Sequence, residues 1–479
     1  VIITPSDLTN YVPLYRAPKD GTITTQFDGE TCMELGLLKM DFLGLKELSL
    51  MDEAERLIRL RQPDFNLLQV PWDDRSTFEL FGKGQTVGVF QFESSGMREY
   101  LRSLRPDDIE DIIAMNALYR PGPMENIPAF ISRKHGQEEV VYDHPQLEPI
   151  LEPTYGIMVY QEQVMRIAQE LAGFTMGQAD ILRKAMGKKK PEEMAKVRKD
   201  FVDGCTSNGV DKNLGENLFR EIEIFAGYAF NKSHAACYSE VAYKNAYLKS
   251  NYPREYMAAS LTTDRDNTDR LTILLDECRQ MDIPVLAPDV NQSAVNFTPT
   301  PDGIRFGLSA VKNVGEGAAH AIVDARIESG PFEDLFELCQ RIDLKAVNRR
   351  VIESLIAAGA IDRTETHRAQ MLEGLDLVLK NAQIVQEQKI RGQISLFEHS
   401  SDEIAQIGKP TLPSTTPWDQ TKCLEREREL LGFYVSSHPL HLYTQDLRYF
   451  ATPINELENL SDGSPVRIGG LINRVSTST

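Results

Sequence analysis

Hydrophobic residues recur every three or four positions shortly after the start of the chain, at Leu48, Met51, Ala54, Leu57 and Ile58. This spacing puts them on one face of an amphipathic helix from Lys46 to about Arg61, with Pro63 just past its end. From there to about residue 290 the chain keeps a helical pattern, interrupted by short segments that contain proline and glycine. The pattern therefore predicts a long, mainly helical region over residues 46–290.

The segment before this helix has the pattern of a buried strand with two charged residues in it. Side chains alternate between the faces of a strand, so Lys39 and Asp41 would share one face. The apolar side chains on the other face would point into a core: Leu38, Met40 and Phe42. A buried carboxylate needs a partner or a metal. The segment by itself fits a strand-end salt bridge as well as a site where Asp41 holds a divalent ion and Lys39 neutralises phosphate.

Two further helical units follow the long helical region. Residues 307–317 contain a glycine-rich turn before a helix to about Arg326, and residues 345–350 open a second helix that ends at Gly359. Glycine lets a backbone approach phosphate closely, and a helix N-terminus offers free N–H groups. The pair therefore favours a tandem helix-hairpin-helix domain that binds the DNA backbone.

The remaining segments differ in composition. Residues 398–420 are rich in proline, serine, threonine and acidic residues, which is typical of a linker. We expect a short helix over residues 423–431 and the first strand of a β-barrel over residues 466–475. Residues 393–397 (Gln-Ile-Ser-Leu-Phe) carry an apolar pair beside the linker. Such a pair is typical of a peptide that docks in a partner's pocket, although a local turn packed on the helix at 369–388 would also explain it.

Composition limits the class of protein. The 479 residues suffice for about three domains, and no apolar run approaches the roughly 20 residues that span a bilayer. The six cysteines show no C-x-x-C spacing and the eight histidines no H-E-x-x-H cluster, which argues against a zinc site and a disulfide framework and favours a reducing cytosol. Because the chain starts at Val1 inside a strand-like pattern, we expect it to be part of a longer protein.

Charge and polar motifs suggest where ligands bind. The net charge of −19 argues against non-specific coating of nucleic acid, yet residues 183–200 hold eight Lys or Arg against three acids, a local charge of +5. Helical spacing puts one basic face there that could grip a triphosphate, or that is simply solvated: Arg183, Lys184, Gly187 and Lys188. Residues 230–234 (Phe-Asn-Lys-Ser-His) offer donors to phosphate, sugar or base, or form a helix cap with Ser233 as the cap. They lack an acid that would complete a catalytic triad.

Eight motifs, in this order, resemble the alpha subunits of bacterial DNA polymerase III, the C family of replicative polymerases. The resemblance covers nearly the whole chain. The motifs occupy residues 25–28, 39–44, 88–94, 119–123, 153–157, 160–163, 185–193 and 225–234.

The resemblance implies a two-metal nucleotidyl transferase and assigns roles to residues. Asp41 would be the third of three palm aspartates that hold two Mg²⁺ ions, the first two lying in a P-D-x-D-x-D motif upstream of Val1. Lys39, Arg183 and Lys184 match nucleotide contacts, and Asn231 and His234 match positions near the nucleotide sugar or the template. Lys188 is added as a nucleotide-binding candidate because it lies on the same basic face. Lys184 stands where the family often has arginine, so it lacks a bidentate guanidinium. The motifs themselves, rather than the resemblance, make Lys232, Gly315, Gly317, Arg349 and Arg350 the candidates for DNA contacts. The residues matched to the sliding-clamp peptide are Gln393, Leu396 and Phe397.

The expected fold class is α+β and predominantly α-helical. The expected domains are the end of a palm (1–45), the fingers (46–290), a tandem helix-hairpin-helix and clamp-binding region (291–397), a linker (398–420), a helical connector (421–462) and the start of an OB-fold (463–479). Expected partners are primer–template DNA, dNTP, the beta sliding clamp, the clamp-loader tau subunit and a proofreading exonuclease, in the cytoplasm at the nucleoid and without a membrane. We expect this chain alone to be inactive in synthesis. The alternatives are a non-catalytic clamp-tethered DNA-binding protein and an error-prone paralogue of the same family.

Overall fold

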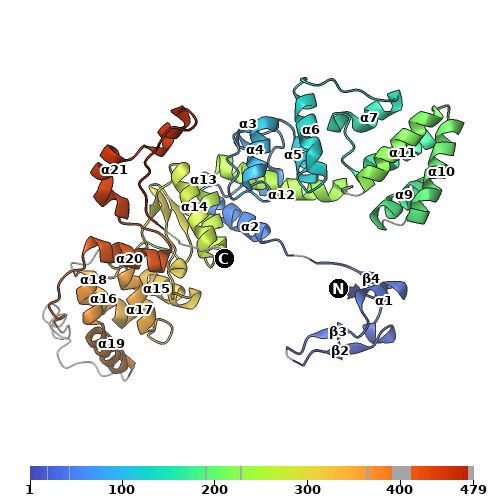
Figure 1. The fold of residues 1–479 in the computed structure, drawn as a ribbon. Coiled ribbons are helices and arrows are strands. Elements are labelled where there is room, and N and C mark those ends of the chain that lie inside the picture. The colour runs from blue at the N-terminus through green and yellow to red at the C-terminus, as the bar shows by residue number, and fades with distance from the viewer. Residues whose placement is uncertain are drawn as a thin grey trace, which may run out of the picture. The chain divides into compact units, whose positions relative to one another are not determined.

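The computed structural model describes residues 1–18, 20–42, 44–188, 191–226, 229–362, 366–390 and 411–472. The chain divides into two compact units, Val1–Ser49 and Leu50–Thr479. The first unit is small and holds two separate two-stranded sheets. Its elements are β1 (Ile2–Ile3), η1 (Leu8–Asn10), β2 (Leu14–Arg16), β3 (Ile23–Thr25), α1 (Gly29–Glu34) and β4 (Leu38–Lys39). Strand β1 pairs antiparallel with β4, with Ile2 opposite Lys39, and β2 pairs antiparallel with β3 (Figure 1).

The sequence analysis predicted a buried strand around Lys39 and Asp41, and this prediction is wrong in two respects: the strand is exposed and it is shorter than expected. Strand β4 has two residues, and the side chains expected in a core are exposed: Leu38 by 57%, Met40 by 43% and Phe42 by 71%. Among the described residues β4 pairs with β1, and this short ribbon has no second layer over its apolar face. A strand pattern fixes which side chains share a face, but burial requires another element to cover that face.

Helices make up the next part of the chain, as the hydrophobic pattern predicts (Figure 1). They are α2 (Lys46–Arg59), α3 (Arg75–Gly82), α4 (Ser95–Leu104), α5 (Ile109–Leu118), α6 (Ile127–Lys134), α7 (Glu148–Leu151), α8 (Gln161–Ala172), α9 (Met176–Lys188), α10 (Pro191–Ser207), α11 (Lys212–Ala226), α12 (Lys232–Asn251), α13 (Pro253–Thr263) and α14 (Thr268–Gln280). Short 3₁₀ turns connect some of them: η2 (Leu67–Gln69), η3 (Pro123–Asn126), η4 (Pro145–Leu147) and η5 (Glu152–Thr154). In α2 the predicted apolar face is buried, except that Leu48 is exposed and Leu50 is buried.

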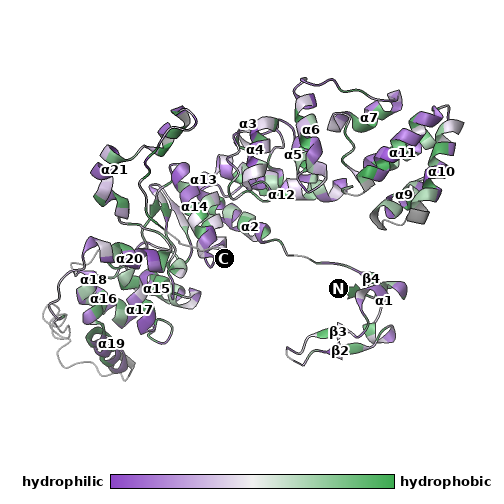
Figure 2. Ribbon diagram, in the orientation of Figure 1, coloured by the Kyte–Doolittle hydropathy of each residue, from purple (hydrophilic) through white to green (hydrophobic). Residues whose placement is uncertain are grey.

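Helix α12 organises the centre of this region. It packs against α3, α5 and α13, and Tyr243, Ala246 and Leu248 on it are completely buried. Helices α8 to α11 form a neighbouring bundle with its own apolar core. There α10 crosses α8 so closely that a Cβ at Gly204 would overlap the carbonyl oxygen of Ala172. Hydrophobic and hydrophilic residues share each helix of the bundle, as amphipathic packing requires (Figure 2).

The C-terminal part combines a small sheet with more helices. Strands β5 (Val285–Leu286), β6 (Thr298–Thr300) and β7 (Gly303–Arg305) form a sheet in the order β5-β7-β6, with β5 parallel and β6 antiparallel to β7. The helices are η6 (Leu308–Ala310), α15 (Glu316–Ser329), α16 (Leu335–Arg341), α17 (Arg349–Ala357), α18 (Arg368–Glu373), α19 (Leu375–Ile390), α20 (Gln420–Leu431), η7 (Pro439–Tyr443), α21 (Thr444–Phe450) and η8 (Ile454–Asn459).

Most sequence-based expectations for this part are confirmed. Helices α15, α17 and α20 lie where they were predicted, and residues 411–419 have no regular secondary structure. The barrel strand expected over residues 466–475 is not formed at 466–472, the described part of it. Val466 and Ile468 there are 46% and 60% exposed, so no described strand or core pairs with them. None of the helices in the described ranges combines the length and apolar character needed to cross a membrane.

Candidate functional site

In the first unit, Lys39 and Asp41 lie on the same face, as their spacing predicts, and form an ion pair. Lys39 Nζ donates to both oxygens of Asp41, at 2.7 Å to Oδ1 and 2.8 Å to Oδ2. The hydrogen bond and positive charge of Lys39 lower the pKa of the Asp41 carboxyl, so it is ionised at neutral pH. The Asp41 side chain is 63% exposed. An ionised, accessible carboxylate is the donor type that Mg²⁺ prefers, so Asp41 fits one ligand position of a magnesium site.

A complete metal site needs several such donors. Within the described ranges, no group of three or more His, Cys, Asp or Glu side chains is placed to hold a metal ion. Asp41 therefore offers one ligand, and further carboxylates would have to come from elsewhere.

In the second unit, the basic pair Arg183 and Lys184 projects from α9. The helix buries Leu182 and Met186 in the core of its bundle, which turns the adjacent basic side chains outward. Both basic groups bind one carboxylate, that of Asp180: Arg183 Nε lies 2.9 Å from Oδ1. Lys184 Nζ lies 2.8 Å from Oδ2. These two contacts lower the pKa of Asp180.

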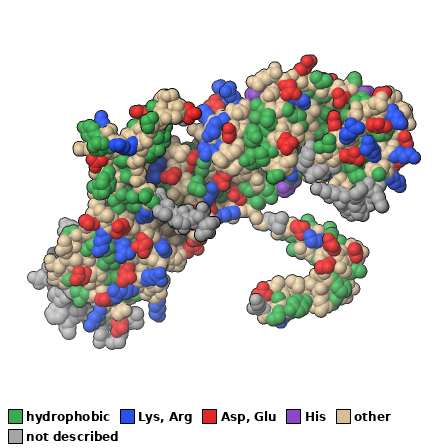
Figure 3. Space-filling model, in the orientation of Figure 1, with side chains coloured by type: hydrophobic (Ala, Val, Ile, Leu, Met, Phe, Trp, Pro, Cys, Tyr) green, Lys and Arg blue, Asp and Glu red, His purple; other side chains and the backbone are tan. Residues whose placement is uncertain are grey.

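The basic groups remain accessible despite this pairing. The side chains of Arg183 and Lys184 are 37% and 59% exposed. Lys188 ends α9, and its side chain lies outside the described part of the chain. Lys and Arg side chains also gather among acidic ones over α10 and α11 (Figure 3). The Lys39–Asp41 pair and the α9 pair belong to different compact units of the chain.

The cap of α12 is Asn231 rather than Ser233. Its Oδ1 accepts a hydrogen bond from the backbone N–H of His234 at 2.9 Å, and the helix begins at Lys232. The predicted cap was two residues late because both positions carry a residue type that caps helices. Lys232 packs inward: its Nζ lies 2.9 Å from Glu110 Oε2 and 5.3 Å from the centre of the Tyr160 ring.

One face of the first turns of α12 carries a row of rings, which we call the aromatic row: Phe230, His234, Tyr238 and Phe90. His234 lies between the other two rings of this face, with centroid distances of 5.4 Å to Phe230 and 4.2 Å to Tyr238. Phe90 reaches the row from a distant loop, 5.2 Å from Tyr238. His234 is exposed and the other three rings are half-buried.

At the other end of the row, the guanidinium carbon of Arg120 lies 3.8 Å from the centre of the Phe230 ring. Burial lowers the pKa of Arg120, and its Nε and Nη2 donate to the carbonyl oxygen of Ala117. The row combines flat apolar faces with a cation, which is the combination that stacks on nucleic-acid bases.

Sequence analysis identified His234 but missed the rest of the row. The spacing of Phe230, His234 and Tyr238, one ring per helical turn, is a signal that could have been used. Phe90 and Arg120 lie in motifs that carried the family resemblance, but no local pattern links them to α12.

The two hairpins of the C-terminal part repeat one arrangement 33 residues apart. Val314 and Val347 are buried in equivalent positions, and Gly315 and Asn348 are the caps of α15 and α17. Asn348 Oδ1 accepts from the N–H of Val351 at 3.2 Å, whereas Gly315 has no side chain with which to cap α15. A Cβ at Gly315 or Gly317 would meet nothing within 4 Å, so this helix start is open to a ligand.

The two arginines at the start of α17 have different surroundings. Arg349 Nε donates to Glu353 at 2.7 Å, and Arg349 also forms an ion pair with Asp376 of α19. Arg350 is exposed. The predicted clamp-binding residues Gln393, Leu396 and Phe397 lie outside the described residues.

Comparison with known proteins shows similarity along the whole chain. Residues 1–44 match the model of the bacterial DNA polymerase III alpha NTPase domain, residues 47–209 that of the finger domain of the same subunit, and residues 282–371 a helix-hairpin-helix motif. The DNA polymerase III subunit alpha of Borreliella burgdorferi is 43% identical over 479 residues, which is 99% of this chain and 42% of the relative. Those of Escherichia coli K12 and Pasteurella multocida are 42% and 44% identical over 98% of the chain. The chain thus spans about 42% of the length of these relatives.

Proposed function

Because this chain belongs to the bacterial DNA polymerase III alpha family, we propose that it supplies part of the active site of a template-directed DNA polymerase. The polymerase would transfer a nucleotide from dNTP to a primer 3′-hydroxyl. The observation that carries this proposal is the unbroken similarity, about 43% identity over 99% of the chain to one relative, together with three domain models matched in order. The chain spans less than half of that relative, so synthesis is assigned to the longer polymerase.

In this proposal Asp41 is a metal ligand and Lys39 a phosphate-binding group. The Asp41 carboxylate, with carboxylates from the rest of the polymerase, would hold Mg²⁺. Bound there, the metal would help activate the primer hydroxyl and stabilise the leaving pyrophosphate. Lys39 Nζ would then exchange part of its contact with Asp41 for a triphosphate oxygen. Its 33% exposure leaves it accessible for that exchange.

Arg183 and Lys184 would bind the triphosphate. Replacing Arg183 with alanine removes a charge-assisted contact to phosphate, which costs roughly 1.5–3 kcal/mol. We therefore expect the KM for dNTP to rise by about ten- to a hundred-fold in steady-state primer extension. The matched control is Arg198→Ala on the adjacent α10, whose 39% exposed side chain pairs with Glu223, and it should leave KM unchanged. An unchanged KM in Arg183→Ala would show that the basic face of α9 is only solvated.

The aromatic row would hold the base or sugar of the nucleotide or template. His234 is the member of the row that the family motif matches, and Asn231, the cap of the same helix, is matched with it. The contacts of His234 with Phe230 and Tyr238 support a stacking role for the whole row. Stacking on an aromatic side chain contributes roughly 1–3 kcal/mol per base and tolerates any base. That tolerance suits an enzyme that must accept all four nucleotides.

The tandem hairpins would bind the backbone of duplex DNA. Because Arg350 is exposed at a helix start, Arg350→Ala in the 479-residue chain is expected to lower DNA affinity equally for unrelated sequences. The slope of log affinity against log salt should fall by about 1, as expected for one lost phosphate contact. Fluorescence anisotropy with two duplexes at several salt concentrations measures both quantities.

The control for this experiment is Arg426→Ala on α20, whose exposed side chain pairs with Glu429. It should leave the salt slope unchanged. A strong preference for one duplex, or an equal change in both variants, would contradict backbone binding by the hairpins.

The remaining partners rest on the family resemblance. We propose that residues 393–397 bind the beta sliding clamp through Leu396 and Phe397, with Gln393 fixing the register. The clamp-loader tau subunit, a proofreading exonuclease and a nucleoid location in the cytoplasm belong to the same proposal.

A further inference from the structure

We propose that the buried pair Lys249 and Glu277 positions the loop of residues 85–93, so that Phe90 takes its place in the aromatic row. This inference rests on the proposed role of the row in binding nucleotide or template. It assigns to two residues outside the row a function in polymerisation that they perform without touching a ligand. They are positioning residues, acting through the backbone of the loop.

The loop follows one face of α12 at three successive points. Phe90 contacts the Tyr238 ring. The hydroxyl of Tyr256 lies 2.7 Å from the Gly88 carbonyl oxygen and 2.9 Å from Asn245 Oδ1. Positions 238, 245 and 249 share a face of α12, since they are separated by seven and then four residues. The loop therefore runs antiparallel to α12, with Lys249 at its base.

Lys249 binds the base of the loop with all of its donors. Its Nζ lies 2.7 Å from the carbonyl oxygens of both Gln85 and Val87, and 2.5 Å from Glu277 Oε1. An ammonium group has three N–H donors, so these contacts satisfy it completely. A shorter or neutral side chain at this position could not hold two carbonyls and a carboxylate at once.

Because Lys249 is buried, keeping its side chain charged costs solvation free energy. Its side chain is 1% exposed and that of Glu277 is 6% exposed. Burial lowers the pKa of Lys249, and the charge and hydrogen bond of Glu277 oppose this effect. Apolar residues commonly replace a buried ion pair without loss of stability. The feature that such a replacement would lose here is the pair of bonds to the loop carbonyls.

The loop has little regular structure of its own to fix it. Residues 85–94 form no helix or strand, and Gly88 and Gln91 have positive φ angles of 84° and 64°. Within the loop, the N–H groups of Val89 and Phe92 donate to the carbonyl oxygens of Thr86 and Val89 at 3.0 and 3.2 Å, and the side chains of Val89 and Phe92 are buried. Thr86 Oγ1 also donates to the Phe92 carbonyl oxygen at 2.6 Å. Glu93 accepts from the Gly88 N–H.

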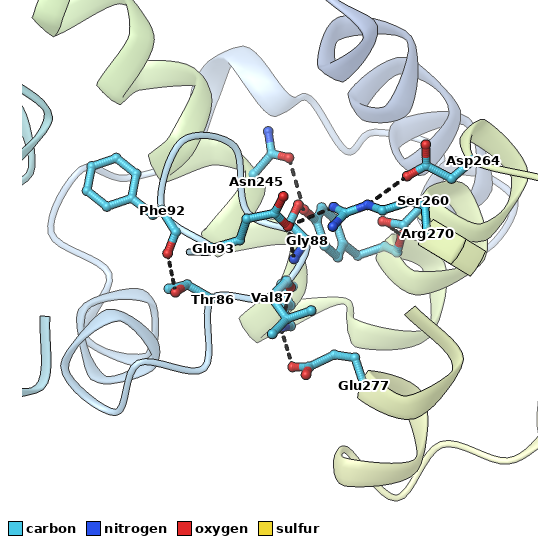
Figure 4. Close-up of polar contacts among 12 residues, drawn as sticks. Thr86, Val87, Gly88, Phe92, Glu93, Asn245, Ser260, Asp264, Arg270 and Glu277 are labelled. Carbon is cyan, nitrogen blue, oxygen red and sulfur yellow. Dashed lines mark hydrogen bonds and ion pairs between the residues drawn. The ribbon is translucent and has the colours of Figure 1, made fainter. Parts of the chain in front are cut away.

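A second ion pair holds the far end of the loop. Glu93 lies 2.7 Å from Arg270, which also binds Asp264 (Figure 4). At the near end, a cavity of about 430 Å³ borders Gln85, Lys249 and Glu277. On the side of this cavity, apolar packing does not fill the space at the base of the loop, and the contacts of Gln85 and Val87 with Lys249 there are polar.

The test compares two kinds of variant. Lys249→Met/Glu277→Met removes both charges together, so no unpaired charge stays buried, and it deletes the bonds to the Gln85 and Val87 carbonyls. Lys134→Met is the control for lost stability, because it breaks another buried ion pair of the same unit, far from the loop in sequence, and leaves its partner Asp111 unpaired. Hydrogen exchange in the 479-residue chain should become at least tenfold faster in residues 85–93 of the double variant and remain unchanged there in Lys134→Met.

The functional readout is the KM for dNTP in the full-length polymerase. We expect Phe90→Ala and the double variant each to raise this KM about tenfold, with less than a twofold change in kcat. Combining Phe90→Ala with Lys249→Met/Glu277→Met should raise the KM no further than Phe90→Ala alone, because the two methionine substitutions affect the KM only by displacing Phe90. If the double variant does not fold, Glu277→Gln provides the test, because it keeps an acceptor for Lys249 but weakens the contact that holds Lys249 against the loop. It should raise the KM less than the double variant, and this rise should disappear on the Phe90→Ala background.

The outcomes separate the inference from the function on which it rests. Unchanged exchange in residues 85–93 of the double variant, or effects on KM that multiply with Phe90→Ala, would overturn the positioning role. Faster exchange together with an unchanged KM in Phe90→Ala would overturn the role of the aromatic row instead, and with it the purpose assigned to the loop. A KM rise in Lys134→Met equal to that in the double variant would show a general effect of lost stability and would also overturn the inference.

Discussion

Replacing Asp41 with asparagine in the full-length polymerase is expected to lower its turnover number by about three orders of magnitude. The variant keeps the size of the side chain but loses the ionised carboxylate that the structure shows at this position, with its pKa lowered by Lys39. Losing a metal ligand removes transition-state stabilisation of several kcal/mol, and about 4 kcal/mol corresponds to roughly a thousandfold in rate. Single-turnover primer extension measures the effect.

The affinity for primer–template DNA should remain nearly unchanged in this variant, since one exposed carboxylate makes no favourable contact with phosphate. Asp7→Asn is the control, because Asp7 lies in the same unit and caps η1, a role that asparagine also fills. Turnover within threefold of the unsubstituted enzyme in Asp41→Asn would refute its role as a metal ligand. An equal loss in both variants would point to general damage of the unit.

The second large effect concerns stability: Lys134→Met is expected to lower the free energy of unfolding by about 3–5 kcal/mol. Lys134 Nζ lies 2.6 Å from Asp107 Oδ1 and 2.8 Å from Asp111 Oδ2, and its side chain is only 8% exposed. These two carboxylates raise its pKa, so it is protonated under all ordinary conditions. Methionine fills similar space but leaves the Asp111 carboxylate, 4% exposed, without its buried partner.

Urea unfolding followed by tryptophan fluorescence provides the measurement, since Trp72 lies in the same unit. Lys83→Met is the control, because Lys83 is 61% exposed and pairs with Glu79 across one helical turn. Such exposed pairs contribute about 0.3–0.5 kcal/mol. A loss below about 1 kcal/mol in Lys134→Met would mean that Asp111 finds other compensation, for example from the backbone N–H groups of Asp107 and Asp108.

The elements that could be predicted from sequence are those whose pattern is local. The apolar face of α2 and the outward basic pair on α9 follow from helical spacing, because a helix makes its backbone bonds within itself. The start of α12 was predicted only approximately, because both Asn231 and Ser233 are residue types that cap helices. In the structure it is Asn231 that accepts the hydrogen bond from the His234 N–H, so the helix begins after Asn231. The burial of β4 was predicted wrongly, because burial depends on whether another element packs over the strand, and the pattern of the strand itself does not encode that.

The contacts of the candidate site could be predicted from sequence only where the residues that make them belong to one segment of the chain. Lys39 with Asp41, and Arg183 with Lys184, are close in sequence. The structure shows the Lys39–Asp41 ion pair, one of the two interpretations of that segment, and it pairs both Arg183 and Lys184 with Asp180, a contact that the sequence analysis did not predict. The aromatic row joins α12 to a loop and to Arg120, and the Lys249–Glu277 pair joins α12 to α14 and that loop. Such contacts arise from packing between distant segments, which periodicity in one segment does not encode.

In the proposed role of the basic pair of α9, Asp180 would set a threshold for the ligand. Its carboxylate contacts both Arg183 and Lys184, so an incoming anion would have to compete with a negative charge already in place. A triphosphate, with several negative charges spread along its length, competes well, whereas a singly charged anion gains little over the aspartate. In that role the aspartate would act as a resident competitor that selects ligands by their charge.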